Sequence, residues 1–227
     1  MLPGSLVRRM RHRALWRRFR RYTMVPKRRF LANLDLCEKA VGRSPGSDAG
    51  TFIECGTWRG GMSFAIATLL DGLQDLHFFD SFQGLPATTA RDGAQAQRIE
   101  ASGGFWHDNN TASEQEFRDN LARFGLADRT AGVHPGWFEE TLPGFSPSRP
   151  ISVLRLDGDW HSSTMTCLVN LYDAVEPGGL ILIDDYYDWE GCARAVHEFL
   201  AARDLPDRIR SHPNAPVAYI LKGVSEG

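Results

Sequence analysis

The sequence predicts an α/β domain with a doubly wound, mostly parallel seven-stranded sheet and an antiparallel edge strand. Short apolar runs typical of strands alternate with stretches of helical apolar spacing, and no internal repeat is present. The runs 151–156 and 179–183 flank a helical stretch at about 162–174, which together make a β-α-β unit. A chain of 227 residues has the length of one such domain. We therefore expect a ligand crevice just outside the carboxyl ends of the strands.

The remaining elements follow in order along the chain. Strands are expected at 51–55, 76–80 and 130–134, and helices at 63–71, 113–124 and 190–202. Ser113 and Glu116 have the spacing of a capping box, which marks a helix start. Two short final strands near 208–211 and 217–222 suggest the antiparallel edge. The polar, Gly-rich stretch 87–112 is expected to be a long loop, and loops of that length are usually functional or disordered.

Composition is that of an ordinary cytoplasmic enzyme. The formal net charge is −2, and no apolar run reaches the roughly 18 residues needed to span a bilayer. Cysteines stand singly at Cys37, Cys55, Cys167 and Cys192, without a CxxC pair. This spacing favours reduced, partly buried thiols over a disulfide framework or a zinc site.

A basic N-terminal arm precedes the rest of the domain. Residues 1–30 hold eleven Lys and Arg and no acid, whereas residues 31–227 hold fifteen basic and twenty-eight acidic groups, a net charge of −13. Residues 6–22 can form a helix with one shared face, made of Val7, Met10, Ala14, Leu15, Phe19 and Tyr22. The arm could dock on the acidic body or a neighbouring subunit, or lie on an anionic membrane surface. Nucleic acid is not expected as a partner, a signal peptide is disfavoured, and a transit peptide stays open.

Acidic clusters follow both strands of the β-α-β unit. Asp157 and Asp159 come after the run 151–156, and Asp184 and Asp185 end the run 179–183. Because parallel strands end at the same edge of the sheet, these carboxylates should converge there and repel one another. A divalent metal ion is the usual way to stabilise such a group, so the pattern predicts a metal in the crevice. For Asp159, a role as helix cap is favoured over a place beside the metal.

The first strand leads into a glycine turn that suits a nucleotide-like methyl donor. Glu54 lies at the strand end, and Gly56, Gly60 and Gly61 open the helix. A nicotinamide cofactor would prefer GxGxxG, and Glu54 would repel its pyrophosphate. An acid here suits the ammonium group of S-adenosylmethionine, and Asp80 at the next strand end can accept hydrogen bonds from ribose hydroxyls. The alternative is that Glu54 and Asp80 are ordinary strand-end acids.

Six motifs in order carry a family resemblance. They are Glu54-Cys-Gly-Thr-Trp-Arg-Gly-Gly61, Phe79-Asp-Ser-Phe-Gln-Gly-Leu-Pro86, Gly136-Trp-Phe-Glu-Glu-Thr-Leu-Pro143, Leu154-Arg-Leu-Asp-Gly-Asp159, Ser163-Thr164 and Gly178-Gly179 with Ile183-Asp-Asp-Tyr186. Together they closely resemble the macrocin O-methyltransferase family, whose members use S-adenosylmethionine and Mg²⁺ to methylate sugar hydroxyls on antibiotics. The resemblance runs from about Tyr22 to Lys222. It implies the class I methyltransferase (Rossmann-like) fold, most of which a dinucleotide-binding dehydrogenase shares.

The resemblance also implies a role for each matched residue. It assigns Asp157, Asp184 and Asp185 to the metal, and residues 22–25 to a segment that helps to close the active site. It assigns donor contacts to Glu54, Gly56, Thr57 and Gly61 on the methionine part, to Asp80, Ser81 and Phe82 on the ribose and adenine side, and to Gly136 and Trp137 around the adenine. For Trp137, a core aromatic at a strand end is the alternative.

One position departs from the family pattern. The family usually reads Asp-Gly-Asp-Leu-Tyr, whereas this chain has Trp160 and His161 after Asp159. His161 is either a general base or substrate contact, or a polar residue at a helix start that faces solvent. We expect Asp157 or His161 to be the general base, and His107 to be a substrate contact. A structural role is expected for His77, His134 and His197.

These observations predict a metal-dependent O-methyltransferase that acts on a hydroxylated small molecule, a sugar or a glycosylated natural product. A catechol or phenol O-methyltransferase is the leading alternative, because vicinal oxygens of either acceptor chelate a metal. A non-catalytic module that binds S-adenosylmethionine or a glycan is the alternative from another class. Family resemblance also makes a homo-oligomer plausible.

Overall fold

The computed structural model describes residues 4–41, 50–73, 75–103 and 110–224 as one sheet covered by helices. The sheet has seven strands in the order β3-β2-β1-β4-β5-β7-β6. These strands are β1 (Thr51–Cys55), β2 (Asp75–Asp80), β3 (Thr130–Pro135), β4 (Ile151–Leu156), β5 (Val175–Ile183), β6 (Arg210–Ser211) and β7 (Ala218–Leu221). The first five are parallel, and β7 is antiparallel to both β5 and β6. The predicted doubly wound sheet with an antiparallel edge is confirmed, and the strand order reverses between β1 and β4.

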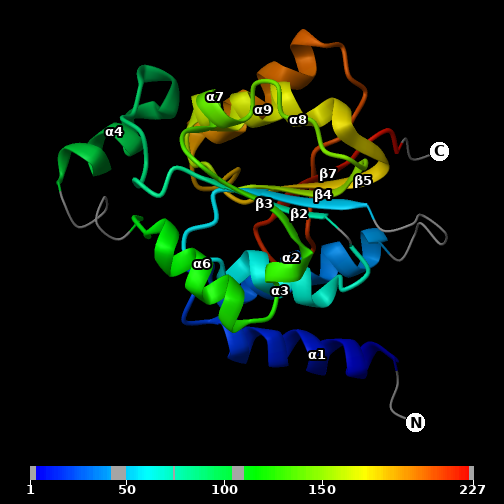
Figure 1. The fold of residues 1–227 in the computed structure, drawn as a ribbon. Helices are drawn as coiled ribbons and strands as arrows, with labels where there is room; N and C mark the ends of the chain where they lie inside the picture. Colours follow the sequence, from blue (N-terminus) through cyan, green and yellow to red (C-terminus); the bar gives the residue numbers. More distant parts are fainter. Residues whose placement is uncertain (1–3, 42–49, 74, 104–109, 225–227) are drawn as a thin grey trace.

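Helices cover both faces of the sheet (Figure 1). On one face lie α2 (Lys27–Val41), α3 (Gly61–Leu69) and α6 (Glu114–Arg123), and on the other α7 (Phe138–Thr141), α8 (His161–Leu171) and α9 (Glu190–Ala202). Single turns occur at η2 (Ala127–Arg129) and η3 (Tyr172–Ala174). Successive strand residues alternate between the two layers, so Phe52 packs with the first set of helices and Ile53 with the second. This double burial explains why the central strands are apolar throughout.

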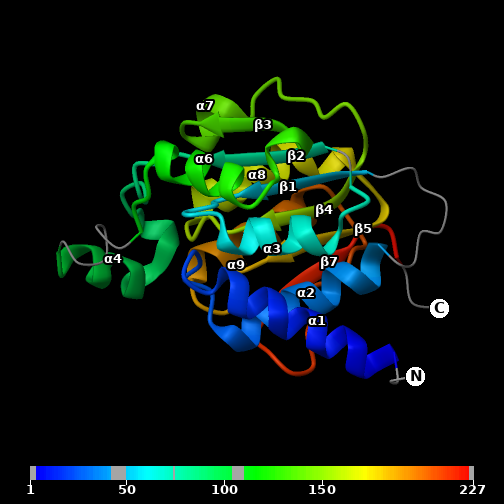
Figure 2. The same cartoon turned by 60° about the horizontal axis from the view of Figure 1, so that its bottom comes forward.

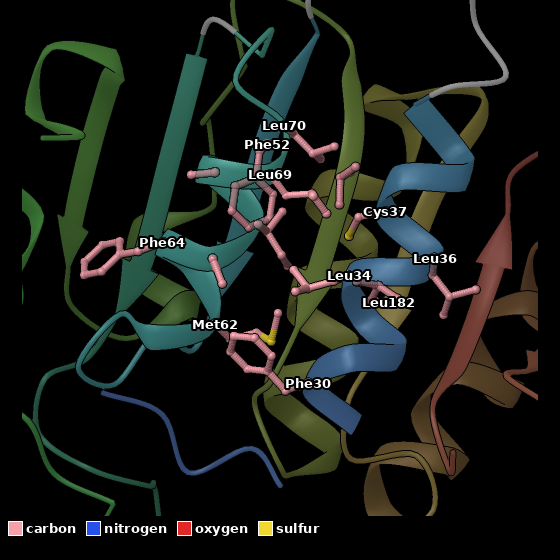
Figure 3. Close-up of a cluster of buried hydrophobic side chains, with 14 of the residues drawn as sticks. Phe30, Leu34, Leu36, Cys37, Phe52, Met62, Phe64, Leu69, Leu70 and Leu182 are labelled. Atoms are coloured by element: carbon pink, nitrogen blue, oxygen red, sulfur yellow. The ribbon is translucent and has the colours of Figure 1, made fainter. Parts of the chain in front are cut away.

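The larger of the two cores lies between β1, β4, β5 and the helices α2 and α3. Figure 3 shows Phe30, Leu34 and Cys37 of α2 in one cluster with Phe52 of β1 and Leu182 of β5. All five of these side chains are fully buried. Burying an aromatic or aliphatic side chain contributes about 1.5–3 kcal/mol, so this layer fixes the sheet on which the site is built.

The basic arm forms helix α1 (Gly4–Phe19), which lies against α2 and α3 (Figure 2). Leu15 and Phe19 are buried in the same core as α2. Glu38 of α2 forms ion pairs with Arg8 and Arg11 and a hydrogen bond with His12. The arm therefore docks on the body of its own domain, which was one of the expected alternatives. Contact with a membrane surface stays a prediction.

The expected face of the arm is only partly correct. Val7 and Met10 are 51% and 56% exposed, whereas His12, expected on no apolar face, is 5% exposed. His12 is buried because it pairs with Glu38 at 2.9 Å. The expected boundary at residue 30 also falls inside α2, so the arm and the domain form a continuous packed unit.

The stretch 87–112 is not a loop throughout. It contains the short helix η1 (Ala90–Asp92) and α4 (Gly93–Ala101), which projects from the body in Figure 1. Thr89 and Asp92 form a capping box at the start of η1. The helix escapes prediction because small and polar residues dominate it, so it has almost no apolar periodicity. His107, the expected substrate contact in this stretch, lies outside the described residues.

Two further expectations concern the described residues as a whole. None of their helices is long and apolar enough to cross a bilayer. All four cysteines are free and buried, as the spacing predicts. Ser113 caps α6 by accepting a hydrogen bond from the backbone N–H of Glu116.

Candidate active site

The turn after β1, residues 56–60, is hereafter the donor turn, and it needs glycine where it meets the next loop. Gly56 has φ +90°, and a Cβ atom there would lie 1.8 Å from the carbonyl oxygen of Asp157. The backbone N–H of Gly56 donates to the Phe79 carbonyl at 2.8 Å. The loops after β1 and β4 therefore touch backbone to backbone, which only glycine permits.

Asp80, at the end of β2, holds the donor turn in place. Its Oδ2 accepts hydrogen bonds from the backbone N–H groups of Thr57 at 2.7 Å and Trp58 at 2.8 Å. Its Oδ1 accepts from the backbone N–H of Phe82 at 2.8 Å. A carboxylate oxygen has two lone pairs, so Oδ1 retains capacity for a further donor such as a hydroxyl. Asp80 thus organises the turn and also faces the cavity beside it.

A cavity lies between the donor turn and the acidic loops. Five of the predicted site residues line it: Gly56, Asp80, Ser81, Trp137 and Asp157. The lining also includes residues that sequence reasoning assigned no place in the cavity: Trp58, Leu85, Pro86, Asn110, Phe138 and Asp159. Met24 of the N-terminal segment lines it too, in agreement with the expected closing role of residues 22–25. Trp137 is half-buried at this wall, not a core residue.

The other predicted donor residues do not line the cavity. Thr57 and Phe82 act through their backbone N–H groups on Asp80, and the Phe82 ring packs on Phe117. Gly61 donates its N–H to the Tyr22 carbonyl at 2.7 Å, so it fastens the N-terminal segment to the start of α3. Gly136 has φ +136° and turns the chain from β3 into Trp137. Their predicted donor contacts stay predictions.

Asp157, Asp184 and Asp185 meet at the ends of β4 and β5, in the loops 157–160 and 184–189, hereafter the metal loops. One oxygen from each lies within 4.8 Å of the others. The oxygens around a single Mg²⁺ lie roughly 3–4 Å apart, so small side-chain adjustments would complete such a site. The predicted convergence of these three carboxylates is confirmed by their positions.

Arg155 is the residue of this site that the sequence analysis missed. Its side chain is fully buried on β4, where Nη1 lies 2.8 Å from Asp157 Oδ2 and Nη2 lies 2.8 Å from Asp184 Oδ1. Nη1 also contacts Glu54 Oε1. The sequence analysis expected a divalent ion as the positive charge among the converging carboxylates, and the structure shows that a guanidinium already stands among them. A charged residue in a wholly buried strand was the available signal.

The single guanidinium does not compensate all the acids around it. Burial, and then the charges of Asp159 and Asp157, hold the pKa of Asp185 well above its ordinary value. Burial and the charge of Asp184 raise the pKa of Asp157 to about 6, against the opposing effect of Arg155. Glu54 lies behind Arg155, off the cavity wall, and burial raises its pKa to about 7. A further cation would relieve this excess of negative charge, so the residues present fit a divalent ion.

Asp159 does not cap α8, contrary to expectation. It adopts φ +56°, which turns its side chain into the cavity wall instead of back toward the helix. Its Oδ1 accepts a hydrogen bond from the indole Nε1–H of Trp189 at 2.8 Å. Its backbone N–H donates to Asp185 Oδ2 at 3.0 Å. The cap of α8 comes instead from Asp92, whose Oδ1 accepts from the backbone N–H of His161 at 2.7 Å.

His161 faces neither solvent nor the cavity. It is 5% exposed, and its Nε2 lies 2.8 Å from Glu198 Oε2 of α9. The expectation that it faces solvent is wrong, and its position does not support a role as general base. The three histidines with an expected structural role make structural contacts: His77 with His134 at 3.1 Å, and His197 with the Tyr186 hydroxyl at 2.8 Å.

Comparison with known proteins adds to this geometry. The family model described as macrocin O-methyltransferase matches residues 6–219, nearly the whole chain. The chain belongs to the macrocin O-methyltransferase family. Demethyldecarbamoylnovobiocin O-methyltransferase of Streptomyces niveus is 35% identical over 83% of this chain and 71% of its own. The 4'-O-methyltransferase of 8-demethyl-8-(2,3-dimethoxy-α-L-rhamnosyl)-tetracenomycin C of Streptomyces olivaceus is 34% identical, with the same coverage of both chains.

Solved structures agree with this membership of the macrocin O-methyltransferase family. The O-methyltransferase NovP superposes with a TM-score of 0.72 at 31% identity, covering 88% of this chain and 82% of that chain. The calicheamicin methyltransferase CalS11 has a TM-score of 0.63 at 18% identity, covering 98% and 95%, which supports the fold alone. The fold is therefore that of the class I methyltransferases, and the protein is an O-methyltransferase.

Proposed function

We propose that the protein transfers a methyl group from S-adenosylmethionine to a hydroxyl of a sugar or glycosylated natural product, with the help of a divalent ion such as Mg²⁺. The observation that carries this proposal is one cavity lined by both Asp80 of the donor side and Asp157 of the metal loops. A donor and an acceptor can therefore meet in a single space. The relative from Streptomyces olivaceus favours a glycoside, since its name gives a rhamnosyl compound as the acceptor.

The donor side would hold S-adenosylmethionine mainly through fixed groups. Asp80 is already positioned by backbone N–H groups, so binding the ribose requires little reorganisation. Trp137 and Trp58 line the same space and offer aromatic faces for a base. Gly56 lets the ligand approach the backbone closely.

The metal side would prepare the acceptor hydroxyl. Asp157, Asp184 and Asp185 would hold the ion, which when bound lowers the pKa of a coordinated hydroxyl and stabilises its negative charge. Arg155 fixes Asp157 and Asp184 from behind, one oxygen of each, so their orientation is set before any ligand arrives. Methyl transfer is an in-line displacement, so holding the acceptor oxygen in a fixed position relative to the methyl group raises the rate.

Asp159 is the residue we assign as general base, in place of His161. Asp159 lines the cavity, where a ligand can reach its carboxylate. The indole N–H of Trp189 holds one of the two carboxylate oxygens in place. A general base must lie within hydrogen-bond reach of the proton it removes, and His161 does not line this space. Asp157 is the less suitable base because it is committed to Arg155 and to the ion.

The test is methylation of two acceptor panels by the purified protein with S-adenosylmethionine and Mg²⁺. One panel holds glycosides, namely mycinamicin III, demethyldecarbamoylnovobiocin and a rhamnosyl tetracenomycin, and the other holds catechols. Mass spectrometry should find a singly methylated glycoside and no methylated catechol. Faster methylation of a catechol than of every glycoside would overturn the sugar assignment. Binding of S-adenosylhomocysteine without any methylation or metal binding would favour a non-catalytic module.

A further inference from the structure

Asp92 joins the segment 87–101, hereafter the insert, to the start of α8, which directly follows the metal loop 157–160. It lies at the end of η1 and is 1% exposed, an unusual place for a carboxylate. Its Oδ2 accepts from the backbone N–H of Thr89 at 2.7 Å and from the Thr89 hydroxyl at 2.8 Å. Its Oδ1 accepts from the backbone N–H of His161, the first residue of α8. Thr89, Asp92 and His161 are hereafter the insert latch.

The start of α8 has no cap from its own loop, so the insert latch supplies it. Trp160, the residue before the helix, makes no side-chain hydrogen bond that caps the helix. The first N–H groups of a helix lack partners within the helix and carry partial positive charge. A buried carboxylate at that point therefore satisfies a donor and also interacts favourably with the helix dipole.

Packing around Asp92 leaves no room for it to move. Gly191, in the first turn of α9, lies so close that a Cβ atom there would be 2.5 Å from Asp92 Oδ1. Gly93, the next residue of the insert, would in the same way meet Glu190 Oε2 at 2.6 Å. The insert is thus pressed against the N-terminal turns of both α8 and α9.

A second, exposed set of contacts surrounds the insert latch. Arg91 Nη1 lies 2.9 Å from Glu198 Oε2, and the ring of His161 lies 2.8 Å from the same oxygen. Hydrogen bonds from His161 and the charge of Arg91 lower the pKa of Glu198. The side chains of Arg91 and Glu198 are 60% and 44% exposed, so water screens their ion pair and it should contribute little to stability.

The insert latch bears on the cavity through Trp160. The indole N–H of Trp160 donates to the Pro86 carbonyl at 2.8 Å, and Pro86 with Leu85 lines the cavity. Trp160 also packs edge-on against Trp189, which holds Asp159. Leu85 and Pro86, hereafter the acceptor wall, therefore line the cavity and are held by Trp160, while the insert latch fixes Thr89, three residues after Pro86 in the chain.

We propose that Asp92 is a positioning residue that holds the acceptor wall in place against the metal loop 157–160 and so sets how well the acceptor binds. The expected effect of Asp92 on turnover rests on the proposed methyl transfer. The contact between Asp92 and the start of α8 does not depend on that proposal. Asp92 reaches the acceptor only through the segment it fixes. Loss of the insert latch should therefore affect the acceptor KM and leave the donor side, on β1 and β2, unchanged.

The experiment compares Asp92→Asn with the wild-type protein. Asn keeps the size of the side chain and can still accept from His161, but its NH₂ group cannot accept from Thr89. Hydrogen exchange by mass spectrometry should become about tenfold faster in peptides covering 85–92 and 158–165. For a methylated glycoside, the acceptor KM should rise about five- to tenfold, while kcat and the Kd for S-adenosylhomocysteine change less than about twofold.

Two further variants keep the result interpretable. Thr89→Ala removes one hydrogen bond to Asp92 and should give the same changes with smaller size, even if Asp92→Asn folds poorly. Glu198→Gln is the matched control, because it alters the exposed contacts around His161 and leaves Asp92 untouched. It should match the wild-type protein within about twofold in both measurements.

The outcomes separate this inference from the proposed function. Exchange within twofold of wild type in Asp92→Asn overturns the role of Asp92, as does a fall in kcat without a rise in KM. Equal effects from Glu198→Gln would also overturn it, because the exposed contacts would then carry the attachment. If the wild-type protein methylates no glycoside, the proposed function fails, and the exchange measurement still decides whether Asp92 holds the acceptor wall.

Discussion

The two sides of the cavity are built by different physical means. The donor side, made by the donor turn and Asp80, is held by backbone N–H groups on a single carboxylate and by close glycine packing. The metal side gathers Asp157, Asp184 and Asp185 around one buried guanidinium, with negative charge in excess. The donor side therefore holds its one carboxylate by hydrogen bonds, whereas the proposed metal side carries an excess of negative charge that an added cation would compensate.

Removal of the guanidinium should break this comparison most strongly. In Arg155→Met, Glu54, Asp157 and Asp184 would lose the cation that they share. Breaking a buried ion pair in this way costs about 3–5 kcal/mol, which urea denaturation followed by circular dichroism would measure. Arg149→Met is the control, because Arg149 is about half exposed and its pair with Asp75 at 3.6 Å should be worth less than about 1 kcal/mol. A loss below 1 kcal/mol in Arg155→Met would show that the carboxylates do not depend on it.

Loss of the metal ligands should remove turnover and spare the donor side. With Asp184 and Asp185 both replaced by Asn, glycoside methylation should fall at least about 1,000-fold, because the hydroxyl is no longer activated. The Kd for S-adenosylhomocysteine, measured by calorimetry, should stay within about threefold of wild type, since neither residue lines the donor end. Asp173→Asn, at an exposed position, should behave as wild type in both assays. A large loss of donor affinity in the double variant would mean that the two sides are not separate.

Loss of Asp80 should give the reverse pattern. Asp80→Asn turns an NH₂ group toward the backbone N–H donors of the donor turn, or else loses the charge that accepts from them. The Kd for S-adenosylhomocysteine should rise about 10- to 100-fold, while the increase in Tm caused by Mg²⁺ stays as in wild type. Asp75→Asn, at the other end of the same strand, is the matched control and should leave both values unchanged. If Asp80→Asn also abolished the increase in Tm caused by Mg²⁺, the donor side would not be separate from the metal side.

The smallest effect is a loss of stability in acid that arises at His77, away from both sides of the cavity. Measurements that compare the donor side and the metal side at low pH must be corrected for this loss. Burial, and then the neighbouring His134, lower the pKa of His77 to about 4. The unfolded chain therefore binds the proton first, so the free energy of unfolding should fall as pH decreases from about 6.5 to 4. His77→Gln should show a shallower decline in urea denaturation across this window. Identical slopes in the two proteins would rule out this origin.

The sequence was sufficient for the features that depend on strand ends. In a parallel sheet, residues after each strand must meet at one edge, so Asp80, Asp157, Asp184 and Asp185 could be placed without a structure. Gly56 was found in the same way. The doubly wound parallel sheet followed from the alternation of strand and helix, and the antiparallel edge from the two short final strands.

Other features depend on tertiary contacts that no local pattern reveals. Arg155 stands in a strand among apolar residues, and only the packing shows that its guanidinium faces three carboxylates. Asp92 lies in a polar stretch, far in sequence from the helix it caps. Asp159 was assigned to a cap because it precedes a helix, and its positive φ turns it elsewhere. His161 departs from the family pattern, and only the structure shows that its ring contacts Glu198, 37 residues away.

The central claim is that the donor side binds without a metal and that the metal side acts only with one. The most direct measurement is glycoside methylation by EDTA-treated protein before and after Mg²⁺ is returned, with the Kd for S-adenosylhomocysteine measured in both states. We predict that turnover disappears with EDTA and returns with Mg²⁺, while the Kd changes less than about threefold. Undiminished turnover in EDTA would contradict the account.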